Sequence, residues 1–134
     1  MLRSFNPPDV APPASRYSHC VEVTGAARWL VISGQVGVTP EASVCEGLAA
    51  QLAQCFANID AGLRAANMTK NNLVKLTVYV TVGGAEALGI YRRGRDSWLG
   101  ENGPVPTGTY VVVAGLASEV FLVEVEALAA AGQD

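Results

Sequence analysis

The residues with the clearest chemical potential are two carboxylates, Glu124 and Glu126, in the apolar segment 120–128. Strand side chains alternate between two faces, so both carboxylates share one face while Val123 and Val125 share the other. Charged groups on an apolar strand are costly to bury unless they stay hydrated, are paired or take part in a reaction. An ionised carboxylate can orient a water molecule and accept its proton, so this strand predicts a candidate general base.

Two alternatives remain for these carboxylates. Glu124 could be an exposed acid, or it could form an ion pair with Lys75 on a neighbouring strand. We interpret Glu126 as structural. Neither carboxylate forms a local metal-binding motif with His19, the only histidine, so the sequence predicts no metal and no cofactor.

Three further motifs accompany the Glu-x-Glu pair: Tyr17-Ser18-His19, Ser33-Gly34-Gln35, and the loop that runs from Pro104 to Thr109. Together they resemble the RidA/YjgF family, whose members are described variously as imine deaminases, translation inhibitors or L-PSP endoribonucleases. The resemblance extends from about residue 13 to residue 130, which is nearly the whole chain.

The resemblance implies a site in a cleft between subunits. Tyr17 and the backbone of Gly34 would contact the substrate there, and Glu124 would hold the water that attacks the C=N carbon of an imine. It also implies the chorismate-mutase-like version of an α+β fold, assembled as a homotrimer. The residues alone favour a strand aromatic that fills the rim of the sheet as the role of Tyr17, and the resemblance makes the site role an equal alternative.

Position 108 departs from the family pattern. Deaminases of the family have Pro-Ala-Arg where this chain has Pro106-Thr107-Gly108. An arginine binds a carboxylate through two parallel hydrogen bonds, and glycine offers only its backbone. We therefore expect poor binding of carboxylate-bearing imino acids. Thr107 and Thr109 could hydrogen-bond a neutral ligand, and Thr107 and Gly108 would line the cleft. The sequence leaves open whether Arg16, Arg28 or a neighbouring subunit replaces the missing cation.

The spacing of apolar residues predicts an α+β domain over residues 1–134 with the order β-β-α-β-α-β-β and both helices on one face of the sheet. Residues 1–15 read as an extended lead-in. The predicted helices are 43–66 and 85–99, and the predicted strands are 16–23, 29–32, 73–82, 110–113 and 120–128. We expect the first two strands to form a hairpin and strand 110–113 to be buried.

The two predicted helices differ in their signals. Ser43 and Glu46 have the spacing of a capping box, which predicts the start of the first helix. Its inward face is predicted to hold Val44, Leu48, Leu52, Cys55, Ile59 and Leu63. The second helix is predicted to place Leu88, Tyr91, Trp98 and Leu99 inward and Arg92, Arg93 and Arg95 outward.

Composition limits the partners of the protein. Half of the 134 residues are hydrophobic and 16% are charged, so some apolar surface is expected to contact another subunit. A net charge of −3 disfavours nucleic acid. The longest apolar run is shorter than the roughly 20 residues of a membrane span, and no signal-peptide pattern is evident. We expect a cytoplasmic protein whose Cys55 is a buried thiol.

These patterns predict a RidA-type protein that binds or transforms a small molecule. Glu124 is the candidate catalytic residue, and Tyr17, Gly34, Thr107 and Gly108 are the candidate binding residues. One function is an enamine or imine deaminase, or a related hydrolase, that does not favour carboxylate substrates. The alternatives are a binding or sensing module without turnover and, less favoured, an RNA-directed translation inhibitor or endoribonuclease.

Overall fold

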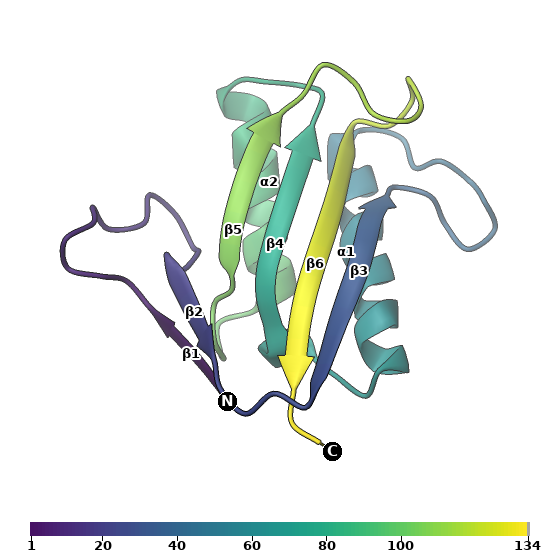
Figure 1. The fold of residues 1–134 in the computed structure, drawn as a ribbon. Coiled ribbons are helices and arrows are strands. Elements are labelled where there is room, and N and C mark those ends of the chain that lie inside the picture. Colours follow the sequence, from purple (N-terminus) through teal and green to yellow (C-terminus); the bar gives the residue numbers. More distant parts are fainter. Residues whose placement is uncertain (134) are drawn as a thin grey trace.

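The computed structural model describes residues 1–133 and contains two sheets and two long helices (Figure 1). The elements are β1 (Leu2–Phe5), β2 (Cys20–Val23), β3 (Arg28–Val36), α1 (Leu48–Ala65), the short 3-10 helix η1 (Lys70–Asn72), β4 (Leu73–Val80), α2 (Ala85–Leu99), β5 (Thr107–Val112) and β6 (Val123–Ala131). The predicted α+β class with helices on one face of the sheet is confirmed.

The central sheet has the strand order β3-β6-β4-β5, so β3 and β5 form its edges. β6 is antiparallel to both of its neighbours, and β5 is parallel to β4. Both helices lie behind this sheet in Figure 1, and its front face carries no helix. Within residues 1–133, neither helix is long and apolar enough to cross a membrane.

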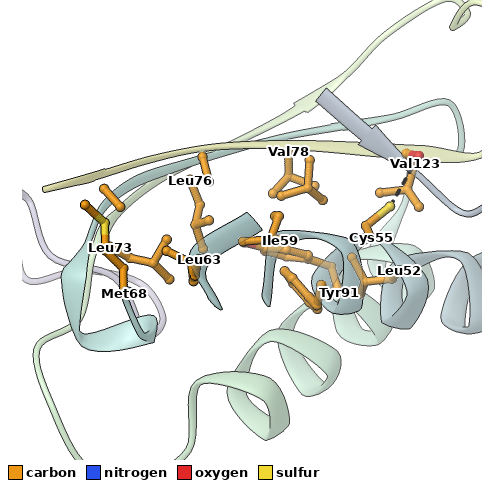
Figure 2. Packing of buried hydrophobic residues seen from close by; sticks show 14 of the residues in the cluster. Leu52, Cys55, Ile59, Leu63, Met68, Leu73, Leu76, Val78, Tyr91 and Val123 are labelled. Atoms are coloured by element: carbon orange, nitrogen blue, oxygen red, sulfur yellow. Dashed lines mark hydrogen bonds between the residues drawn. The ribbon is translucent and has the colours of Figure 1, made fainter. Parts of the chain in front are cut away.

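The core fills the space between α1 and the sheet (Figure 2). Leu52, Cys55, Ile59 and Leu63 recur at three- and four-residue steps along α1, and all four are buried as the sequence predicts. They lie against Val78 and other apolar side chains of the sheet. Burial of each such side chain contributes roughly 1.5–3 kcal/mol, so this face fixes the sheet on α1.

The N-terminal pairing differs from the prediction. β2 pairs with β1, which lies inside the predicted lead-in, and β3 pairs with β6 instead of forming a hairpin with β2. The predicted hairpin is therefore wrong, and the chain has one strand more than predicted. The β1–β2 ribbon has its own ion pair, in which Arg3 Nε lies 3.1 Å from Glu22 Oε1.

α1 begins later than predicted. Its N-cap is Gly47, with no side-chain cap, and Val44 is exposed. The capping box at Ser43 does not form because the backbone there is used elsewhere: the Ser43 carbonyl accepts a hydrogen bond from the Thr39 N–H at 2.9 Å. The predicted end of the helix, at residue 66, agrees with the structure to within one residue. Asn67 follows the helix with a left-handed backbone (φ 55°).

Two predictions of burial are also wrong. Segment 110–113 was expected to be buried, but β5 is an edge strand and Val112 is 54% exposed. Arg95 was expected to point outward from α2, but it is only 5% exposed. α2 itself has the predicted bounds.

Candidate functional site

Tyr17 lies over the first residues of β5. The adjacent residue Ser18 donates two hydrogen bonds to the loop that precedes β5. Its N–H donates to the Pro106 carbonyl (3.0 Å) and its hydroxyl to the Val105 carbonyl (2.7 Å). These bonds hold the segment before β2 against the loop before β5. A Cβ atom added to Gly108 would lie 3.5 Å from the Cβ of Tyr17, which is ordinary van der Waals contact.

A cavity of about 210 Å³ opens beside Gly108, between the N-terminal segment, α2 and β5. Its lining is mainly aromatic and polar and contains two arginines. The lining residues are Ala14, Ser15, Tyr17, Leu88, Tyr91, Arg92, Arg95, Gly108, Thr109 and Tyr110. The structure thus brings two of the predicted site residues, Tyr17 and Gly108, into one cavity.

The two arginines of this cavity were not among the site residues predicted from the sequence. Arg95 lies over the ring of Tyr91, with its guanidinium carbon 5.2 Å from the ring centroid, and its Nε donates to Asp96 at 3.0 Å. The signal was present in the helical spacing: positions 88, 91 and 95 fall on one face of α2. Because Leu88 and Tyr91 are inward, the same period places Arg95 inward too.

Thr107 has a different position from Gly108. Its hydroxyl donates to the Val74 carbonyl at 3.1 Å, which fixes the side chain against β4. Side chains alternate along β5, so Thr107 lies on the helix-free face of the sheet, whereas Gly108 and Tyr110 lie on the helix side. The ring of Tyr110 confirms this orientation, because it lies 5.0 Å from that of Tyr91 on α2.

Glu124 and Gly34 form a second group on the helix-free face. Gly34 lies where the register between β3 and β6 shifts, and its missing side chain leaves the space that the Glu124 carboxylate occupies. Within residues 1–133, no hydrogen bond or ion pair engages this carboxylate, so the expected alternative of a pair with Lys75 is not observed. Glu126 instead accepts a 2.7 Å hydrogen bond from the Tyr79 hydroxyl.

The predicted site residues therefore fall into two groups on opposite sides of the sheet. Tyr17 and Gly108 line the cavity beside α2, whereas Gly34 and Glu124 lie on the face without helices. A site that uses both groups needs more than one copy of the chain.

Other candidate groups have structural partners. The Cys55 thiol lies 3.1 Å from the Gln35 carbonyl, and burial raises its pKa to about 12, which confirms the predicted buried thiol. His19 Nε2 lies 2.7 Å from the Ala11 carbonyl. Arg28 donates to the Ala66 and Gly132 carbonyls and does not line the cavity.

Comparison with known proteins agrees with this architecture. The family described as Endoribonuclease L-PSP matches residues 8–131, so the chain belongs to this family, which includes the RidA/YjgF proteins. A RutC family protein of Aquifex aeolicus is 41% identical over 81 residues, covering 60% of this chain and 62% of the relative's length. The match thus spans less than two thirds of that relative.

Solved structures support the same fold. The Rid-family protein YyfB of Yersinia pestis, whose function is unknown, superposes with a TM-score of 0.89 at 28% identity, covering 97% of this chain and 98% of that one. RidA of Psychrobacter gives 0.70 at 29% identity, with 96% and 99% covered. YjgF of Escherichia coli gives 0.69 at 25% identity, with 96% and 98% covered.

Proposed function

We propose that this protein hydrolyses the C=N bond of a small imine, or of the imine tautomer of an enamine, with Glu124 as general base. The observation that carries the proposal is the half-buried Glu124 carboxylate, which no described protein group engages, lying over a residue without a side chain. Such a carboxylate is free to orient water beside a ligand that approaches the backbone of Gly34.

The chemistry needs no further cofactor. Water adds to the carbon of the protonated imine while Glu124 takes one of its protons, which gives a neutral carbinolamine. Glu124 returns this proton to the nitrogen, the C–N bond breaks to release ammonia, and the hydroxyl proton passes to Glu124 and then to solvent as the C=O bond forms. Backbone groups of Gly34 and the hydroxyl of Thr107 would bind polar atoms of the substrate.

We further propose that the complete site forms between copies of the chain in a homotrimer. The helix-free face carries the apolar side chains Trp29 and Val31, which are 53% and 78% exposed. Contiguous apolar surface of this kind is typical of an interface. Packing of this face against another copy would bring Gly34 and Glu124 towards the Tyr17–Gly108 group of that copy.

A binding or sensing module without turnover is the second candidate. The replacement of the family's arginine by Gly108 favours it, because the contact that orients substrates in deaminases of the family is missing. An RNA-directed role is less favoured, since the chain is acidic and offers one histidine for acid–base chemistry. Saturable binding of a small ligand with no product would support the module.

The test is an ammonia-release assay on 2-iminopropionate and on an imine without a carboxylate. Wild-type protein is compared with Glu124→Gln and with Glu126→Gln, a matched control on the same strand face. We expect Glu124→Gln to lower kcat at least a hundredfold, in keeping with the 10²–10⁴ range of general acid–base catalysis, and Glu126→Gln to stay within about threefold. Equal loss in both variants, or full activity of Glu124→Gln, would rule out the proposed role.

A further inference from the structure

Three residues that line the cavity beside Gly108 each have a buried polar atom without a hydrogen-bond partner among the described residues. These atoms are Arg95 Nη2, the Nε of Arg92 and the hydroxyl oxygen of Tyr110. All three residues line the cavity, and they approach it from two elements, α2 and β5. The gathering of these three residues around one small cavity is the feature that needs an explanation.

Structural interactions account for only part of the Arg95 guanidinium. Its Nε donates to Asp96 in an ion pair, its Nη1 lies 3.5 Å from the Ser15 hydroxyl, and its guanidinium carbon lies over the ring of Tyr91. Within residues 1–133, Nη2 has no hydrogen-bond partner. A guanidinium cannot lose its charge in a protein, and a buried charged donor without an acceptor is unfavourable. A ligand that accepts a hydrogen bond at Nη2 removes that cost.

The electrostatics of the cavity favour a negative ligand. Its described lining contains two arginines and no acidic residue; Arg95 is ion-paired with Asp96, which lies outside the lining, and Arg92 has no ion-pair partner within residues 1–133. The arginine nitrogens are donors only, and the Tyr110 hydroxyl can donate as well. Burial raises the pKa of Tyr110, which keeps this hydroxyl protonated at neutral pH. The ligand must therefore supply acceptor atoms and a negative charge.

We propose that Arg95, assisted by Arg92 and Tyr110, binds the carboxylate of a small organic ligand in the cavity beside Gly108. This inference deepens the proposed function and rests on it for the remainder of the substrate. It moves the anion contact from β5 to α2, which removes the reason to expect poor binding of carboxylates. The cavity, at about 210 Å³, is smaller than the roughly 300–1,000 Å³ of drug-sized sites, so the ligand is small.

The test measures binding to the assembled protein by NMR shift perturbation, independently of turnover. The probes are pyruvate, its neutral amide and inorganic phosphate. The variants are Arg95→Met and, as a matched control on the same helix, Arg93→Met, because Arg93 is exposed and does not line this cavity. We expect saturable pyruvate binding that weakens at least tenfold in Arg95→Met and changes less than twofold in Arg93→Met.

The comparison of probes decides the ligand class. Binding of the amide should be at least tenfold weaker than that of pyruvate, and phosphate should bind no better than pyruvate. Preference for phosphate would overturn the carboxylate assignment. Absence of pyruvate binding at tens of millimolar, or equal binding by Arg95→Met, would overturn the site itself.

A conservative variant protects the test against misfolding. Arg95→Lys keeps the charge and the apolar stem but loses the planar fork, so pyruvate should bind at least fivefold more weakly while the melting temperature is preserved. Unchanged affinity in this variant would contradict the proposal. Arg95-dependent pyruvate binding without any ammonia release would uphold this inference and refute the proposed hydrolysis, so the two failures are distinguishable.

Discussion

The carboxylate of Glu124 occupies the space in which a side chain of residue 34 would lie. A Cβ atom built on Gly34 would overlap Glu124 Oε2 and lie 2.6 Å from its carboxyl carbon. Glycine at position 34 is therefore a requirement of this carboxylate position, in addition to any contact of its backbone with a ligand. The relationship joins two strands, β3 and β6, that are separated by most of the chain.

Gly34→Ala should displace the Glu124 carboxylate and lower turnover at least tenfold. The fold should tolerate the change, because the displaced group is the far end of a half-exposed side chain. Kinetics and thermal unfolding of Gly34→Ala are compared with those of Gly115→Ala, where an added Cβ meets nothing within 4 Å. Undiminished kcat in Gly34→Ala would show that catalysis does not depend on this carboxylate position.

Gly108→Arg should make the binding of a carboxylate ligand less dependent on Arg95. The new side chain starts without a clash, since the added Cβ would be in ordinary van der Waals contact with the Tyr17 Cβ at 3.5 Å. We expect Arg95→Met to weaken pyruvate binding tenfold in the wild-type background and less than threefold in Gly108→Arg. This double-mutant cycle measures the coupling between the two positions, and equal losses in both backgrounds would mean that they bind the anion independently.

Val31→Asp should disrupt assembly. Val31 is 78% exposed on the helix-free sheet face, so a carboxylate there would be desolvated in an interface between copies. Light scattering after size exclusion should give a trimer for the wild type and a smaller species for Val31→Asp. Val10→Asp, at another exposed valine in the N-terminal segment, should remain trimeric. A trimeric Val31→Asp protein would place the interface elsewhere.

Cys55 should make the protein less stable at alkaline pH. Burial is the first cause that raises its pKa from 9.0 to about 12, and the negative charge of Glu124 is the second. Above pH 9 the unfolded chain loses this proton while the folded protein keeps it, so the free energy of unfolding falls as pH rises.

The effect of Cys55 is measured by urea unfolding at pH 8 and pH 10 in the presence of a reductant. The wild type should lose about 1–2 kcal/mol more over this interval than Cys55→Ala. Tyrosines contribute equally to both proteins, so the difference isolates the thiol. Parallel pH profiles for the two proteins would contradict a buried, protonated Cys55.

Gln51→Met should destabilise the fold by about 2–4 kcal/mol. Gln51 is buried; its amide nitrogen donates to the Cys45 and Val120 carbonyls, and its oxygen accepts from the Leu122 N–H at 2.8 Å. Methionine fills the space but leaves these backbone groups unpaired. As a control, the free energy of unfolding of Gln54→Met in urea should change by less than about 0.5 kcal/mol, because Gln54 is only partly buried and its amide donates to a neighbouring side chain, Asn58. Similar small losses in both variants would contradict a structural role for Gln51.

Periodicity alone was sufficient where one face of an element is buried in the same chain. The spacing from Leu52 to Leu63 predicted the inward face of α1, and the bounds of α2 followed from Gly84 and Gly100 on either side. The prediction for Arg95 was wrong because it followed the charge of that residue, whereas its period with Tyr91 indicated the inward position that the structure shows. Contact with Tyr91 and Asp96 offsets the desolvation of the guanidinium.

The amino-acid sequence by itself determined the α+β class, the family and the two carboxylates on one face of β6, because these depend on local spacing and motif. Only the tertiary structure decided which strands pair, that Glu124 lies over Gly34, and that Arg95 shares a cavity with Gly108. Those relationships join segments far apart in the chain. Strand pairing and side-chain burial depend on contacts across the whole fold, so no local pattern encodes them.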